Sequence, residues 1–89
     1  MRSECLDIAK EITTSDRNKD YGEPEDNFSL IAKLWSNYLD IEISAIDVSM
    51  LMTLLKIARV KTGTTNLDNY IDIAGYAACA YEIDSKLDC

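Results

Sequence analysis

Five polar residues in the second half of the chain have the types and spacing of a binding site. Lys56 and Arg59 are three residues apart, whereas Asp68 and Asp72 are four apart with Asn69 between them. Because residues three or four apart share one face of a helix, each stretch presents a polar stripe. Cations of this kind bind phosphate groups, and carboxylates or amides bind ribose hydroxyls. The pattern is typical of a site for a nucleotide.

The same residues also have a purely structural interpretation. If a turn centred near Thr64 makes the two stretches antiparallel, Lys56 lies level with Asp72, and Arg59 lies level with Asp68. Two ion pairs would then lock the hairpin, and each would add little to its stability. However, both cations lie inside an otherwise apolar stretch, where desolvation favours specific partners. The sequence leaves open whether those partners are the aspartates or a ligand.

Aromatic side chains could complete the site by stacking on a base. Tyr21 follows Asp20 in a polar loop just before a helix N-terminus, where anions bind readily. Tyr76 continues the stripe of Asp68 and Asp72 by a further step of four residues. The predicted ligand-binding residues are Asp20, Tyr21, Lys56, Arg59, Asp68, Asn69, Asp72 and Tyr76.

The composition narrows the chemistry that this site could perform. The chain has no histidine, which removes every Ser-His or Cys-His catalytic arrangement and the usual general base near neutral pH. Its three cysteines, Cys5, Cys79 and Cys89, have no C-x-x-C spacing, so we predict neither a disulfide framework nor a zinc site. We expect a binding protein rather than an enzyme, with no catalytic residue, no bound metal and no cofactor.

The charge of the chain indicates the class of its partner. The 89 residues include 16 acidic and 9 basic side chains, which gives a net charge of −7. A surface of that sign repels nucleic-acid backbones and anionic lipids. No apolar run approaches the roughly 18–20 residues that cross a bilayer, and the N-terminus has no signal-peptide core. We expect a cytoplasmic protein that binds a small nucleotide-derived molecule, and neither a nucleic-acid polymer nor a membrane.

Helices are predicted to position these residues within a single all-α domain, residues 1–89. Apolar residues at helical spacing indicate four helices, over residues 3–14, 24–39, 45–61 and 67–86. Ser44 and Asp47 resemble a capping box at the start of the third helix. Gly63 can end that helix, and Asn66 can cap the fourth. Because the connection is short, the last two helices should form a C-terminal antiparallel hairpin.

The apolar positions predict which helix faces are buried. The predicted core stripe of the third helix consists of Ile46, Met50, Leu54 and Ile57. Phe28 and Trp35 in the second helix are interpreted as core aromatics. Small residues around Gly75 in the fourth helix would let a neighbouring helix approach closely. Because a domain of this size buries only about 60–65% of its unfolded surface and is marginal alone, we predict a homo-oligomer assembled through the fourth helix.

Longer motifs extend over almost the whole chain, from Ile8 to Glu82. They are Asp20-Tyr21-Gly22, Asn27-Phe28, Ile31-Ala32, Leu34-Trp35, Tyr38-Leu39, Asp47-Val48, the run from Leu54 to Arg59 and the run from Asp68 to Ala78. Together they resemble a family of small uncharacterised proteins from phages and prophages. The resemblance implies a phage origin and an all-helical fold.

A phage origin suggests a function by analogy. Small helical, oligomeric phage proteins with cations in a pocket between subunits include sponges, which sequester nucleotide signals made by CBASS or Thoeris defence systems. A sponge needs binding groups and no general base. We therefore predict a counter-defence protein that sequesters a nucleotide-derived immune signal, either a cyclic oligonucleotide or an ADP-ribose derivative.

Two other functions remain open. A MazG-like nucleoside triphosphate pyrophosphohydrolase also pairs antiparallel helices and holds magnesium with E-E-x-x-E on one helix and E-x-x-D on the next. Here the helix before the turn offers Asp47 but no Glu-x-x-Glu, and the helix after it offers Asp68 and Asp72 near the turn but no Glu-x-x-Asp. Most of the expected metal ligands are therefore missing. The third possibility is a structural or host-protein-binding module, which would show a large apolar patch without a polar pocket.

Overall fold

The structure, a computed structural model, describes residues 1–14 and 24–87, and this part of the chain contains four helices. They are α1 (Arg2–Thr14), α3 (Pro24–Leu39), α4 (Ala45–Thr62) and α5 (Asp68–Leu87). Each helix begins and ends within one residue of its predicted bounds, so the all-α prediction is confirmed. Asp20 and Tyr21 of the predicted site lie outside the described residues. None of these four helices is long and apolar enough to cross a membrane.

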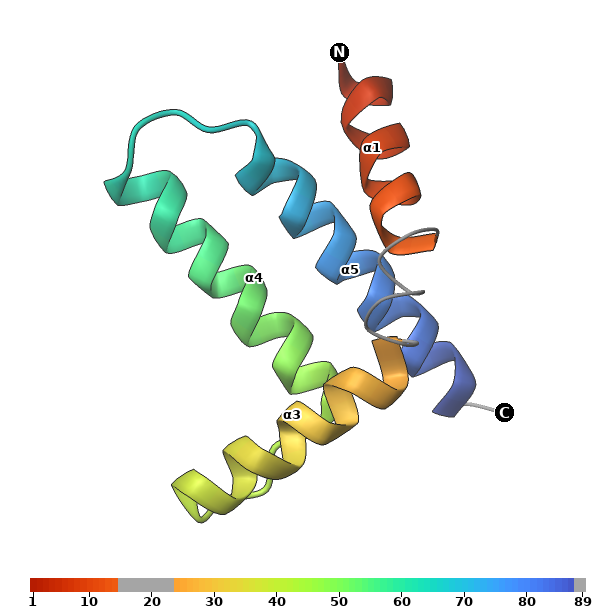
Figure 1. The fold of residues 1–89 in the computed structure, drawn as a ribbon, viewed down its shortest axis with the longest axis vertical. Helices are drawn as coiled ribbons and strands as arrows, with labels where there is room; N and C mark the ends of the chain where they lie inside the picture. Colours follow the sequence, from red (N-terminus) through yellow and green to blue (C-terminus); the bar gives the residue numbers. More distant parts are fainter. Residues whose placement is uncertain (15–23, 88–89) are drawn as a thin grey trace.

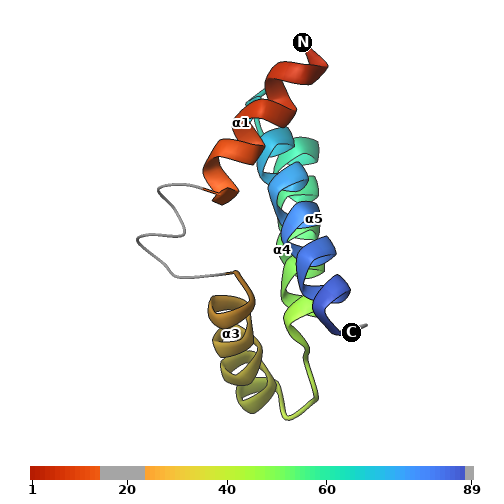
Figure 2. The same ribbon diagram turned by 90° about the vertical axis from the view of Figure 1, so that its right-hand side faces the viewer.

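The helices form two layers. α4 and α5 lie side by side and antiparallel, as the hairpin prediction requires (Figure 1). α1 and α3 both lie on one face of this pair (Figure 2). Within the described part of the chain, α1 packs on α5 alone, whereas α3 crosses the end of the hairpin that is remote from the α4–α5 loop. The last turns of α4 therefore have α5 as their neighbour.

Local hydrogen bonds fix the helix ends. The Ser44 hydroxyl accepts a hydrogen bond from the backbone N–H of Asp47, and the Asp47 carboxylate accepts one from the N–H of Ser44, both at 3.0 Å. This pair is the predicted capping box. At the start of α5, the Asn66 side-chain oxygen accepts a hydrogen bond from the N–H of Asp68 at 2.9 Å. The predicted caps of α4 and α5 are thus confirmed.

Gly63 ends α4, and its lack of a side chain is required there. Its N–H donates to the carbonyl oxygen of Arg59 at 2.9 Å, and a Cβ at Gly63 would lie only 2.9 Å from the same oxygen. We expect Gly63→Ala to lower the free energy of unfolding by about 1 kcal/mol, after the smaller entropy of the unfolded alanine chain is included. Urea denaturation measures this change.

Gly75→Ala is the matched control for this prediction. A Cβ at Gly75 would meet the Cγ2 atom of Thr13 at 3.4 Å, which is close to an ordinary contact. Alanine also stabilises a helix interior relative to glycine by roughly 0.5–1 kcal/mol. If Gly63→Ala were as stable as the wild-type chain, a Cβ atom at position 63 could not clash with the carbonyl oxygen of Arg59.

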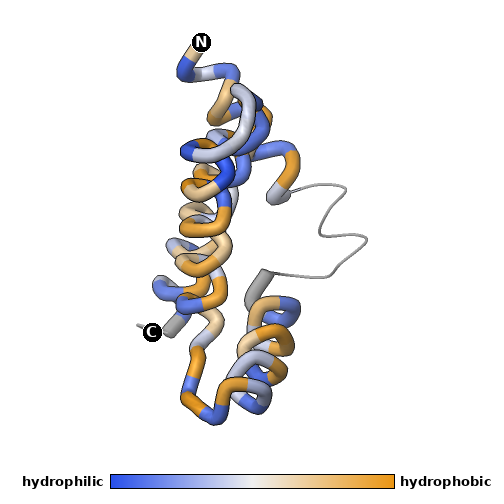
Figure 3. The backbone as a smooth tube through the Cα atoms, turned by 90° about the vertical axis from the view of Figure 1, so that its left-hand side faces the viewer, coloured by the Kyte–Doolittle hydropathy of each residue, from blue (hydrophilic) through white to orange (hydrophobic). Residues whose placement is uncertain are grey.

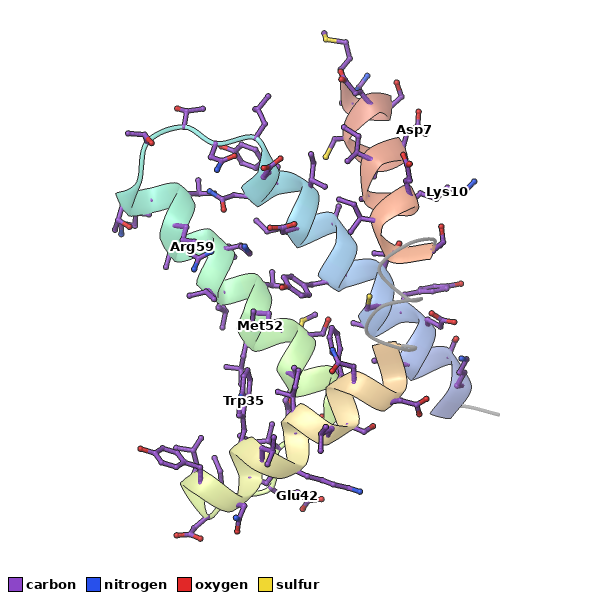
Figure 4. All side chains as sticks on the ribbon, in the orientation of Figure 1. Asp7, Lys10, Trp35, Glu42, Met52 and Arg59 are labelled. Atoms are coloured by element: carbon purple, nitrogen blue, oxygen red, sulfur yellow. The ribbon has the colours of Figure 1, made fainter. Side chains whose placement is uncertain are left out.

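The hydrophobic core lies where α3 crosses the hairpin. Its buried members are Phe28 and Ala32 from α3, Val48 from α4, and Cys79 and Ile83 from α5. Trp35 is partly buried and packs against this cluster, and its side chain extends from α3 towards Met52 of α4 (Figure 4). The interpretation of Phe28 and Trp35 as core aromatics is therefore confirmed.

The predicted core stripe of α4 is largely wrong. Ile46 does pack against the core, but Met50, Leu54 and Ile57 are exposed. The side of α4 that faces the other helices carries Val48, Ser49, Met52 and Lys56. Because α4 is apolar around most of its circumference, spacing alone could not identify the buried stripe.

The small-residue face of α5 meets a neighbour from the same chain. Gly75 is buried, and α1 approaches it closely through Thr13. Ala9 of α1 and Ile71 of α5 are also buried. The close approach predicted for this face is thus made by α1. Assembly of the chain through α5 stays a prediction.

Candidate functional site

The two polar stripes meet across the hairpin at one ion pair. The Nζ atom of Lys56 lies 2.8 Å from Oδ2 of Asp72, and the two side chains are 13% and 24% exposed. The register that puts these residues level is the one expected from a turn near Thr64. The interpretation of Lys56 and Asp72 as partners is therefore confirmed, and the pair joins α4 to α5 in the half of the hairpin nearer the loop.

A second polar contact between α4 and α5 lies further from the loop than the Lys56–Asp72 pair. It is two turns away along α4, at Ser49, and one turn away along α5, at Tyr76. The Ser49 hydroxyl, which is fully buried, donates a hydrogen bond to the backbone carbonyl of Tyr76. The ring of Tyr76 packs against Phe28, with ring centroids 6.3 Å apart. This ring is thus part of the core contact with α3. Its predicted stacking on a ligand has no support from this arrangement.

Arg59 lies one helical turn beyond Lys56, towards the loop (Figure 4). Its side chain and that of Asp68 are both exposed, and within residues 1–14 and 24–87 neither makes an ion pair. The second ion pair of the structural interpretation is therefore not formed in this part of the chain. A guanidinium without a carboxylate partner keeps all five N–H donors for another group.

Asn69 is the most unusual member of the set. It is only 8% exposed. It precedes Asp72 by three residues and Tyr76 by seven, so it lies on the side of α5 that faces α4. Its side-chain amide has no hydrogen-bond partner among the described residues. Such a group costs about 1–3 kcal/mol when it is left unpaired, so it calls for a water molecule or a ligand.

Of the predicted site residues, Lys56 and Asp72 are in direct contact. Arg59 and Asn69 lie within one turn of this pair along α4 and α5, on the loop side, and ligand binding by the set stays a prediction. Nothing in the sequence marked Asn69 as buried, because its burial depends on how α4 covers it. Across the described segments, no group of three or more histidine, cysteine, aspartate or glutamate side chains could hold a metal ion.

The unpaired amide leads to a prediction about stability. We expect Asn69→Leu to raise the free energy of unfolding by about 1 kcal/mol in protein refolded without small molecules, since an apolar group no longer needs a hydrogen-bond partner. Thermal denaturation measures this change. Asn37→Leu, at an exposed position on α3, serves as the control and should change stability little. A large loss of stability in Asn69→Leu would mean that the amide is satisfied.

Comparison with known proteins gives relatives from phages. Residues 4–84 match the family described as a domain of unknown function, DUF6378. The Gene 55 protein of Mycobacterium phage D29 is 48% identical over 83 residues, which are 93% of this chain and 55% of that protein. The Gene 55 protein of Mycobacterium phage L5 is 42% identical over 73 residues, 81% and 47% of the two chains. The chain therefore spans about half the length of these relatives. No solved structure matches it.

Proposed function

Since the chain belongs to the DUF6378 family and is similar to proteins of two mycobacteriophages, we propose that it is a phage counter-defence protein that sequesters a nucleotide-derived immune signal. The signal would be a cyclic oligonucleotide or an ADP-ribose derivative. One observation carries the proposal: the loop end of the hairpin holds a guanidinium, Arg59, and a buried amide, Asn69, that the described part of the chain does not pair.

The guanidinium suits the phosphate group of a nucleotide, and the amide suits its ribose or base. A guanidinium binds a phosphate group through two parallel hydrogen bonds, and such charge-assisted bonds are about twice as strong as neutral ones. An amide offers both a donor and an acceptor to a ribose hydroxyl or a base edge. In a chain of net charge −7, an anionic ligand can bind only where cations offset the overall repulsion. Arg59 and Lys56 supply those cations within one turn of α4.

The Lys56–Asp72 pair leaves capacity for a ligand. An ammonium has three N–H donors, and a carboxylate has about four acceptor positions, whereas each of these side chains is engaged by the other through one short contact. Both remain partly exposed. We propose that Lys56 adds a second bond to phosphate, while the Asp72 carboxylate accepts from a ribose hydroxyl. Asp68 lies in the first turn of α5, and we place it at the rim of the site.

Binding without hydrolysis is the version of this proposal that fits the residues best. The chain has no histidine, and sequestration needs no general base. A MazG-like reaction needs several carboxylates from paired helices to hold magnesium, whereas Asp47 is the only acidic residue of α4. A host-protein-binding module is the second candidate, and the exposed apolar residues of α4 favour it.

Calorimetric titration tests the proposal. We expect saturable binding of at least one ligand when the protein is titrated separately with cyclic dinucleotides and with ADP-ribose derivatives, and we expect chromatography to recover that ligand intact. Recovery of a cleaved nucleotide would instead identify an enzyme. Failure to bind any of these ligands would leave the apolar surface of α4 as the chain's main interaction site.

A further inference from the structure

The side of α4 that faces away from α5 is apolar and exposed. Its central residues are Met50, Leu51, Leu54, Ile57 and Ala58, all exposed, and Leu54 is 58% exposed. Figure 3 views the molecule from this side, where α4 is nearest, and shows hydrophobic residues in orange along the helix. Contiguous apolar patches larger than about 300–600 Å² are rare on monomeric proteins and mark interaction sites. This run of exposed apolar side chains marks the outer face of α4 as an interaction surface.

The spacing on the outer face has the period of a helix–helix seam. Asp47, Leu51, Leu54, Ala58 and Lys61 follow one another by steps of four, three, four and three residues. This is the heptad spacing with which two helices pack along their lengths. The occupant indicated by this pattern is therefore another helix.

The charges on the outer face identify that helix. Leu54 is at the centre, with the acidic Asp47 seven residues before it and the basic Lys61 seven residues after it, and both charged residues are exposed. When two copies of α4 pack antiparallel with Leu54 against Leu54, each Asp47 meets a Lys61 of the other copy. The outer face is thus self-complementary under a two-fold axis, as an isologous dimer requires. It also adds no net charge, so two chains of net charge −7 can approach there.

We propose that this face binds a second copy of the same chain, as an antiparallel α4–α4 pair with its two-fold axis beside Leu54. In this arrangement Leu51 packs against Ile57 of the other copy, and Met50 packs against Ala58. The inference is independent of the proposed nucleotide site, because the Lys56–Asp72 pair lies on the opposite, α5-facing side of α4.

Disulfide trapping tests this register directly. In a chain in which Cys5 and Cys89 are replaced by serine, Leu54→Cys should give a disulfide-linked dimer as the main product of mild oxidation, since residues on the two-fold axis have Cα atoms within the roughly 4.4–6.8 Å that a disulfide spans. Met50→Cys is the matched control on the same face. Its two copies would be eight residues apart along the helices, or about 12 Å, so it should stay unlinked.

Charge reversal gives a second, non-covalent test. Lys61→Asp places an aspartate opposite each Asp47, and sedimentation should show the dissociation constant of the dimer raised about tenfold or more. Lys33→Asp, an exposed lysine on α3, makes the same change in net charge and should leave the dimer intact. A chain that sediments as a monomer at micromolar concentration would overturn the proposal. Equal cross-linking of Leu54→Cys and Met50→Cys, or equal effects of both charge reversals, would overturn it as well.

Discussion

Asp72→Ala is expected to lower the free energy of unfolding by about 2–3 kcal/mol, whereas Lys56→Met should cost less than about 1 kcal/mol. The two changes break the same ion pair, but they leave different groups behind. Without the carboxylate, the Lys56 ammonium has no ion-pair partner although its side chain is only 13% exposed. Losing the ammonium leaves a carboxylate that is nearer to water, and methionine keeps the packing of the lysine stem. Chemical denaturation of both variants measures the asymmetry.

The matched control is an ion pair at the surface. Lys86 and Glu82 lie 3.3 Å apart on α5 with about half of each side chain exposed. Glu82→Ala should therefore change stability by less than about 1 kcal/mol. The double variant Lys56→Met, Asp72→Ala should be more stable than Asp72→Ala alone, because it no longer buries an unpaired charge. If Asp72→Ala were as stable as the wild-type chain, the pair could not be what closes the hairpin interface.

Arg59→Ala should weaken nucleotide binding by roughly ten- to a hundredfold and leave the melting temperature unchanged. A charge-assisted hydrogen bond contributes about 1.5–3 kcal/mol, which corresponds to that range of affinity. Because Arg59 has no ion-pair partner in the described part of the chain, removing it should strand no carboxylate. Calorimetric titration and thermal denaturation of the same samples separate the two effects.

Lys33→Ala is the control for general electrostatic attraction. Lys33 is an exposed cation on α3, and its loss changes the net charge by the same amount. We expect it to bind the ligand nearly as well as the wild-type chain does. A lower melting temperature for Arg59→Ala, with unchanged affinity, would instead assign Arg59 a structural role in the hairpin.

The helices and the hairpin register could be predicted from the sequence because local signals determine them. Ser44 with Asp47, Gly63 and Asn66 mark the helix ends through backbone hydrogen bonds that involve only nearby residues. A short turn then fixes which residues of α4 and α5 are level. The partnership of Lys56 with Asp72 follows from that register and needs no knowledge of the rest of the fold.

The buried side of α4 could not be predicted in the same way. Met50 and Leu54 are as apolar as Val48 and Met52, and the choice between the two sides depends on where α3 and α5 lie. The burial of Asn69 depends likewise on the packing of α4 against α5. For the same reason, the small residues around Gly75 predict a close helix neighbour but not which helix it is, and in the structure α1 takes that position.

If the chain sequesters a nucleotide-derived signal, as we propose, the intact signal is bound at the loop end of its hairpin. The most direct test is mass spectrometry of small molecules released by heating protein that has been purified from cells making such signals. We predict that an intact cyclic oligonucleotide or ADP-ribose derivative is released in amounts comparable to the protein, and in much smaller amounts from Arg59→Ala. Release of cleaved products alone, or of no nucleotide at all, would contradict the claim.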